Sequence, residues 1–233
     1  MTLLLGARGR SHILITADGQ RSVGTGSAGT VADTNLQKVF PADNRPLAVA
    51  HHGQNIINGQ PVHELIPAFL HENMAGLAEC SVRQICAQLI LDFDNAVTET
   101  LRRIPDSVQF GVWIAAIEPA FSRPSIYEIC WSKEGFVDNG MDILVSVTRL
   151  GDTVFGGDGK EYILEYLEQA ISPELSHQHV YFRPLQYSKA VQDELYSLAL
   201  QRQAERQEHR FGGHKHQLAI TREGCDWLIA PSS

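Results

Sequence analysis

The order of apolar segments along the chain limits its fold more than any single motif does. Short runs with strand-like composition come first, segments with helical spacing follow over residues 57–103, and strands, two helices and strands complete the chain. A doubly wound parallel sheet requires a steady alternation of strand and helix, which this order lacks. We therefore expect an α+β fold in which hairpin strands form antiparallel sheets and helices pack outside them.

The individual segments are assigned from their composition and their ends. Apolar runs at 2–7 and 12–18 predict a β-hairpin, and the run LAVAHH predicts a strand that ends at Gly53. Helices are expected over 62–79, 81–104, 160–171 and 188–207, and strands over 109–118, 125–132 and 142–150. A Gly-rich turn is expected at 151–159, and residues 211–230 predict a closing hairpin that turns at Glu223 and Gly224. No linker or repeat divides the sequence, so we expect one domain over 1–233.

Composition excludes several classes of partner. The net charge of −8 and a pI near 5.6 argue against nucleic acid, because phosphate binding needs clustered Lys and Arg. No run approaches the roughly 18 apolar residues of a membrane span, and the first apolar run lacks the preceding basic residues of a signal peptide. The four cysteines form no CxxC pair, which predicts free, reduced thiols and a cytoplasmic location; they are Cys80, Cys86, Cys130 and Cys225.

Two local motifs match the residue pattern of a binding site but lack the surrounding features that such a site needs. The run GTGSAG at 24–29 matches GxGxxG, but no strand leads directly into it and no amphipathic helix follows, so we interpret it as a loop. His214 and His216 would share one face of a strand, without an obvious third metal ligand, which favours a solvated face. We expect no metal site and no cofactor.

Thr2, Asp18 and Lys38 form the candidate reactive group. Removal of Met1 would leave a threonine that carries both a hydroxyl and a free α-amine, which together make a known kind of nucleophile and base. Asp18 ends an apolar strand, and Lys38 lies among apolar neighbours. If the two side chains meet, each stabilises the other's charged form. On spacing alone, an ordinary surface ion pair of little energetic value is the more frequent outcome.

The combined order of these motifs resembles the proteasome β-subunit family, including its bacterial relative HslV. The resemblance extends from the Thr2 strand through ITADGQRS, NLQK and LAVAHHG to FGGDGKEYILEYLEQAI and the final helix, G-G turn and hairpin. It implies the four-layer α-β-β-α sandwich of N-terminal-nucleophile hydrolases. It also implies an N-terminal threonine peptidase that cuts polypeptides and assembles as a homo-oligomeric ring, and an ATP-dependent unfoldase is a partner that the family allows.

The resemblance assigns a role to each matching residue. Thr2 matches the nucleophile, with its own amine as base, and Lys38 lowers the pKa of the hydroxyl while Asp18 orients Lys38. Gly53 is the best match for the glycine whose N–H stabilises the oxyanion, a contribution of about 3–4 kcal/mol. Asp158 falls where the family has a serine beside the N-terminal amine. His51 falls where the family shapes the pocket for the residue before the cut bond.

The departures from the family leave alternatives open. A carboxylate at Asp158 would raise the pKa of the terminal amine, and the family's Asp and Ser before the final G-G turn fall on Glu208 and Phe211. One alternative is therefore a proteasome-like ring subunit with little or no catalysis. A second alternative is an amidase of the same class that acts on a small molecule. For His51, the alternative to a role in the substrate pocket is a packed histidine at a strand end.

Overall fold

Two five-stranded antiparallel sheets form the centre of the molecule in a computed structural model, which describes residues 2–23, 30–43, 45–77, 80–104, 109–118, 123–137, 140–170 and 183–231. In spatial order, the first sheet contains β12 (Thr153–Gly156), β1 (Leu4–Arg8), β2 (Ile13–Asp18), β13 (Lys215–Thr221) and β14 (Gly224–Ile229). The second contains β11 (Gly140–Arg149), β10 (Arg123–Val137), β9 (Gln109–Glu118), β6 (Leu47–Gly53) and β5 (Val39–Pro41). Two short ribbons pair β3 (Arg21–Val23) with β4 (Thr30–Asp33) and β7 (Ile56–Ile57) with β8 (Gln60–Pro61).

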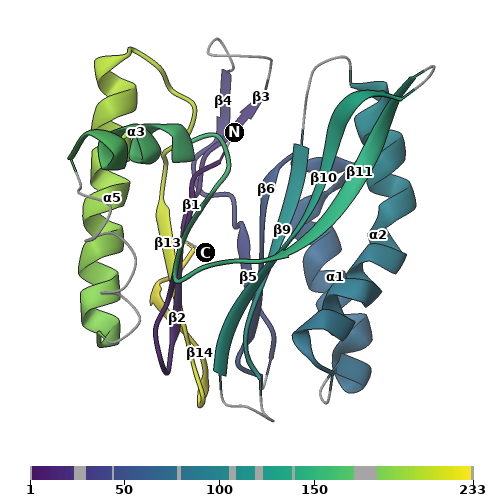
Figure 1. Ribbon diagram of the computed structural model, residues 1–233, viewed down its shortest axis with the longest axis horizontal. Coiled ribbons are helices and arrows are strands. Elements are labelled where there is room, and N and C mark those ends of the chain that lie inside the picture. The colour runs from purple at the N-terminus through teal and green to yellow at the C-terminus, as the bar shows by residue number, and fades with distance from the viewer. Residues whose placement is uncertain are drawn as a thin grey trace.

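Four helices in the described residues cover the outer faces of the sheets. Helices α3 (Lys160–Ala170) and α5 (Leu185–Glu205) lie beside the first sheet, whereas α1 (Val62–Leu77) and α2 (Val82–Arg103) lie beside the second (Figure 1). Helix pair, sheet, sheet and helix pair therefore follow one another across the molecule. This arrangement confirms the expected α+β class with antiparallel sheets inside and helices outside.

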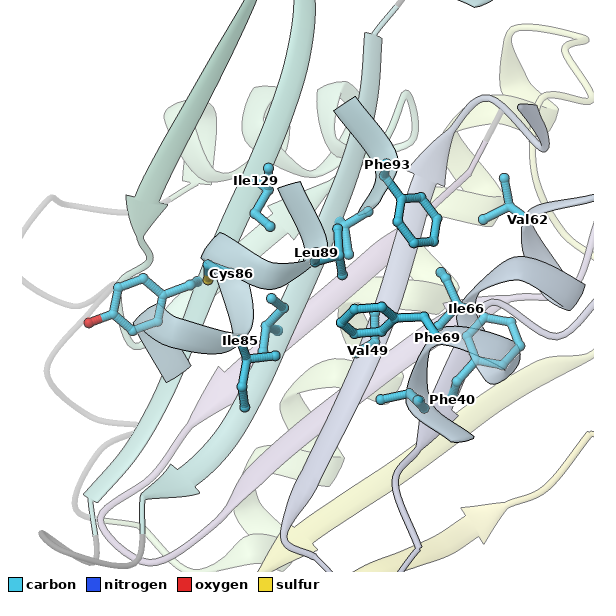
Figure 2. Close-up of a cluster of buried hydrophobic side chains, with 14 of the residues drawn as sticks. Phe40, Val49, Val62, Ile66, Phe69, Ile85, Cys86, Leu89, Phe93 and Ile129 are labelled. Atoms are coloured by element: carbon cyan, nitrogen blue, oxygen red, sulfur yellow. The ribbon is translucent and has the colours of Figure 1, made fainter. Parts of the chain in front are cut away.

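The largest apolar cluster joins α1 and α2 to the outer face of the second sheet. Helix α2 begins with a capping box at Ser81, whose side chain accepts from the backbone N–H of Gln84. Its core-facing residues recur at helical spacing, as the sequence predicted; they are Val82, Ile85, Cys86, Leu89, Phe93, Val97 and Leu101. Figure 2 shows this stripe against strand side chains such as Val49 and Ile129, with Phe69 of α1 packed edge-on to Phe93.

A second cluster fills the space between the sheets. Trp113 of β9, Ile15 of β2 and Leu218 of β13 are fully buried in it. A third cluster packs Leu3 and Leu5 under α3 and α5. Side chains alternate between the two faces of β1, so Leu3 and Leu5 face the helices while Leu4 faces the other sheet.

Most expected elements are present, but β10 is longer at both ends than the strand expected over 125–132, and one expected turn contains a strand. The hairpin pairs Leu4 with Ala17, β6 ends at Gly53, and β9 has the expected bounds. The Gly-rich stretch expected as a turn includes strand β12, which pairs with β1 at the edge of the first sheet. Only four residues form this strand, so its sequence pattern is too short to stand out beside the glycines.

The remaining predictions about the chain's organisation have mixed outcomes. All four cysteines are free, as expected. No helix among the described segments is both long and apolar enough to cross a membrane. The GTGSAG run lies outside the described residues, and the single domain over 1–233 stays a prediction.

We expect Gly6→Ala to destabilise the fold. A Cβ atom at Gly6 of β1 would lie 2.5 Å from Val154 Cγ2 and 3.1 Å from Trp113 Cζ3, inside the packed space between the sheets. Overpacking of this kind costs about 1–3 kcal/mol of unfolding free energy. Urea denaturation of the variant measures the change.

Gly151→Ala is the matched control. A Cβ atom at Gly151 meets nothing within 4 Å, so its unfolding free energy should stay within about 0.5 kcal/mol of the parent. Equal losses of unfolding free energy in the two variants would contradict the explanation that close packing excludes a side chain at Gly6.

Candidate functional site

The carboxylate of Asp18 is the centre of the candidate site. Asp18 is the last residue of β2 and is fully buried. Its Oδ1 accepts from the backbone N–H of Leu3 at 2.8 Å and from Lys38 Nζ at 2.9 Å. Its Oδ2 accepts from the N–H groups of Gln20 and Gly212, each at 3.2 Å. Both carboxylate oxygens are therefore bound, as a buried charge requires.

Lys38 reaches this carboxylate from the segment that enters the second sheet. Its side chain is fully buried, and Nζ also donates to the carbonyl oxygen of Gln20 at 2.7 Å. Burial lowers the pKa of Lys38, while Asp18 and then Asp158 act in the opposite direction. The pair is thus not the exposed ion pair that spacing alone would favour.

Thr2 lies immediately beside this pair. Leu3, the next residue, donates to the same Asp18 oxygen that accepts from Lys38. The Thr2 side chain is fully buried, and its Oγ1 has no hydrogen-bond partner among the described residues. A buried hydroxyl without a partner is unusual, and this one belongs to the residue directly before the amide that binds Asp18.

A glycine turn between β12 and α3 holds the Thr2 backbone. Gly159 donates its N–H to the Thr2 carbonyl at 3.1 Å. A Cβ atom at Gly157, whose φ is +76°, would lie only 2.1 Å from that carbonyl oxygen. The approach therefore requires glycine at 157. Asp158 lies in the same turn, close enough for its charge to favour the charged form of Lys38.

Gly53 is the last residue of β6 in the second sheet. The N–H of His51 donates to the Lys38 carbonyl at 3.1 Å, so the end of β6 runs beside the Lys38 backbone. Gly53 has a φ of +85°, and a Cβ atom there would lie 2.1 Å from the Gln109 carbonyl oxygen. Both the conformation and the space call for glycine.

His51 packs as a buried residue next to the site. Its ring is fully buried and lies between Phe40 and Phe110, with centroid distances of 6.1 and 6.4 Å. Burial, followed by the charge of Lys38, holds the pKa of His51 well below its usual value. The neutral form of the ring is therefore favoured. Its substrate-binding role stays a prediction.

The turn that follows α5 arranges its side chains away from Thr2. Glu208 accepts from the Tyr162 hydroxyl and pairs with Arg210, whose Nε lies 2.9 Å from Oε2. Phe211 is buried against the Tyr162 ring under α3 and α5. The contribution of this turn is instead the backbone N–H of Gly212, which reaches Asp18.

Residues that contribute through their backbone atoms were not predicted from the sequence. The N–H of Gly212, the N–H and C=O of Gln20, and the Gly157–Gly159 turn all build the site without a reactive side chain. The G-G and G-x-G spacings were the available signals, because glycine often marks a close approach of two backbone segments.

The expectation of a solvated His214 and His216 face is wrong. His216 is fully buried beside Trp227, and its Nε2 lies 3.2 Å from Asn35 Oδ1. The Asp18–Lys38 pair occupies the adjacent interior, so the strand end there is covered. His214 precedes β13 and is half-buried. In the described part of the chain, no group of three or more His, Cys, Asp or Glu residues could hold a metal ion.

Comparison with known proteins does not identify a family. No protein-family model and no curated protein matches the chain. The site's geometry therefore carries the functional argument by itself.

We expect Asp18→Asn to destabilise the protein more than Lys38→Met does. Loss of the carboxylate charge leaves a buried ammonium without its counter-charge, which costs about 3–5 kcal/mol. Loss of the lysine leaves a carboxylate that still accepts three backbone N–H groups. Urea unfolding of both variants measures the difference.

The exposed Arg103–Glu99 pair of α2 supplies the control. Arg103→Met should leave the unfolding free energy unchanged within error, because such pairs contribute little. A cost for Lys38→Met equal to that of Asp18→Asn would contradict the role given to the three N–H donors.

Stability should fall as the pH drops from about 6.5 to about 4. Burial, with a further contribution from His214, lowers the pKa of His216 to about 4, whereas the unfolded chain titrates near 6.5. Between these values the unfolded state binds more protons, so unfolding becomes easier as pH falls. Urea midpoints at pH 7 and 5 should differ less in His216→Gln than in the parent. An unchanged difference would exclude His216 as a source of the acid sensitivity.

Proposed function

We propose that this protein is an N-terminal threonine peptidase with the N-terminal-nucleophile hydrolase fold. Thr2 Oγ1 is the nucleophile once Met1 has been removed, and the Thr2 amine accepts its proton. The observation that carries the proposal is the fully buried Lys38–Asp18 pair, which shares a carboxylate oxygen with the amide that follows Thr2. A structural ion pair does not need to be fully buried, and perturbed ionisable groups of this kind cluster at functional sites.

Each part of the group has a chemical role in acyl transfer. A threonine hydroxyl is a weak nucleophile and needs a base, and a free α-amine has an ordinary pKa near 7.7–8.0. The positive charge of Lys38 lowers the pKa of the hydroxyl, and Asp18 fixes its ammonium group. The hydroxyl attacks the peptide carbonyl, the oxyanion binds the Gly53 N–H, and the proton passes through the amine to the leaving nitrogen. Water then releases the acyl group.

Processing before Thr2 is a necessary part of this proposal. While Met1 is attached, the Thr2 nitrogen belongs to a peptide bond and cannot accept a proton. Aminopeptidases generally accept methionine before a small residue such as threonine, so no self-cleavage is needed. Intact mass of purified native protein shows whether the first residue is Thr2.

A non-catalytic subunit with the same architecture is the second candidate. It is favoured by the turn after α5, where Glu208 is bound by Tyr162 and Arg210 and Phe211 lies in the apolar core. That turn therefore offers Thr2 no side-chain hydroxyl or carboxylate. Ring assembly, polypeptide substrates and an unfoldase partner belong to the proposal for either candidate.

We expect protein that begins at Thr2 to hydrolyse fluorogenic peptides and to form a covalent adduct with a peptide epoxyketone. Thr2→Ala should abolish both, because it removes the nucleophile, and Thr2→Ser should retain part of the activity. Thr148→Ala, on the exposed face of β11, is the matched control. Peptide mapping locates the adduct.

The outcomes separate the candidates. An adduct on Thr2 with peptide hydrolysis supports the peptidase. Protein that begins at Thr2 yet forms no adduct and cleaves no peptide supports the non-catalytic subunit. An adduct on Thr2 with no cleavage of any peptide in a library favours the amidase of small molecules.

A further inference from the structure

A second buried polar cluster lies between the sheets, one residue from Gly53. His52 of β6 is buried, and its Nε2 lies 2.8 Å from Glu128 Oε1 of β10. Trp113 Nε1 donates to the same oxygen at 3.0 Å. Because a carboxylate oxygen accepts, Nε2 carries the proton and the ring has a fixed orientation.

Electrostatics favour an ionised Glu128 in this cluster. Burial alone would raise the pKa of Glu128, but the hydrogen bond from His52, the charge on the His52 ring and the hydrogen bond from Trp113 together hold the pKa below its usual value. Lys160, at the start of α3, adds a smaller effect in the same direction. The His52 ring is therefore bound to a charged acceptor, which makes a stronger hydrogen bond than a neutral one.

The ring of His52 is enclosed by two glycines from different sheets. A Cβ atom at Gly111 of β9 would lie 2.1 Å from His52 Nε2, so the ring occupies the space that a side chain would fill. A Cβ atom at Gly156 of β12 would lie 3.2 Å from His52 Cδ2. The ring therefore lies close to Gly156, the residue before Gly157, together with the ring of Trp113, which a Cβ atom at Gly156 would approach to 2.7 Å.

These contacts connect the two halves of the candidate site. Thr2 is held through Gly157 and Gly159 of the turn that follows the first sheet's edge strand, whereas Gly53 belongs to the second sheet. The distance between the nucleophile and the oxyanion donor thus depends on how the sheets are spaced at this point. His52 is the residue before Gly53 and lies against the residue before Gly157.

We propose that His52, fixed by Glu128, is a positioning residue that sets the spacing between Thr2 and the Gly53 N–H. This inference rests on the proposed function, because it assigns Gly53 to the oxyanion. His52 does not touch the reacting atoms and transfers no proton. It holds the ends of β6 and β12 so that the carbonyl oxygen of a bound acyl group meets the Gly53 N–H as charge develops.

The test compares two reactions of Thr2 that differ in their need for an oxyanion donor. Peptide hydrolysis passes through a tetrahedral oxyanion, whereas addition of Thr2 to a peptide vinyl sulfone does not form one at a carbonyl. We expect His52→Ala to lower kcat for peptide hydrolysis about ten- to hundred-fold. Losses of this size are typical when an oxyanion donor, here the Gly53 N–H, is displaced by up to about 1 Å. KM and the rate of vinyl sulfone labelling should change less than three-fold.

Two further variants separate positioning from general stability. Glu128→Gln retains an amide oxygen that accepts from His52 and Trp113, so it should recover most of kcat, whereas Glu128→Leu should resemble His52→Ala. His12→Ala is the matched control: His12 is also buried and hydrogen-bonded, to Ser188 of α5, but it lies outside the site. It should lower stability and leave kcat unchanged.

Failure of this inference is distinguishable from failure of the proposed function. If the parent reacts with both probes and His52→Ala retains its kcat, the positioning role is wrong while the peptidase stands. Equal losses in hydrolysis and vinyl sulfone labelling would also overturn it, because His52 would then act on Thr2 or on the fold. If the parent protein neither hydrolyses peptides nor forms the vinyl sulfone adduct, the proposed function is wrong and the positioning role of His52 is wrong with it.

Discussion

The buried carboxylate of Asp18 is the interaction on which the rest of the structure depends. It receives N–H groups from the start of β1, from the segment after β2 and from the turn before β13, together with the ammonium group of Lys38. Four separate segments therefore converge on two oxygens. A buried ion pair rarely adds much net stability, because desolvation offsets the attraction. Its value here is geometric, since each partner fixes the position of a different strand.

The site is divided between the two sheets, and this division explains its construction. Thr2 and Asp18 belong to the first sheet, and Lys38 and Gly53 enter from the second. A reactive group assembled in this way needs contacts across the gap, and the gap is otherwise filled by apolar residues such as Trp113 and Leu218. The Lys38 side chain makes one polar contact across it, and the His52 ring approaches Gly156 of the first sheet through its Cδ2 atom.

The sequence predicts those parts of the fold that have strong periodicity or clear ends. Helix α2 is amphipathic and capped, and β9 is a continuous apolar run, so both could be located closely. Strand β12 and the burial of His216 could not be predicted in this way, because both depend on which other segment of the chain packs against them. A four-residue strand and a single histidine acquire their environment only from tertiary packing.

The same distinction between predictable and unpredictable features applies to the candidate site. Thr2, Asp18 and Lys38 were identified from side-chain chemistry and from the resemblance to proteasome β-subunits, and in the structure Asp18 binds both Lys38 and the backbone N–H that follows Thr2. The N–H of Gly212 and the Gly157–Gly159 turn act through backbone atoms, which carry no residue-type signal beyond glycine itself. His52 and Glu128 are 76 residues apart. Only the pairing of β6 and β10 with the intervening β9 brings them together.

The turn between β12 and α3 has a mechanical consequence for the outer layer of the molecule. Gly159 binds the Thr2 carbonyl, and α3 begins at the very next residue. Helix α3 packs against α5 on the outside, where Arg206 pairs with Glu165. A displacement of this helix along its axis would reach Thr2 through the peptide bond between Gly159 and Lys160 and the one hydrogen bond from Gly159. The position of the outer helix α3 is thus coupled directly to the position of the proposed nucleophile.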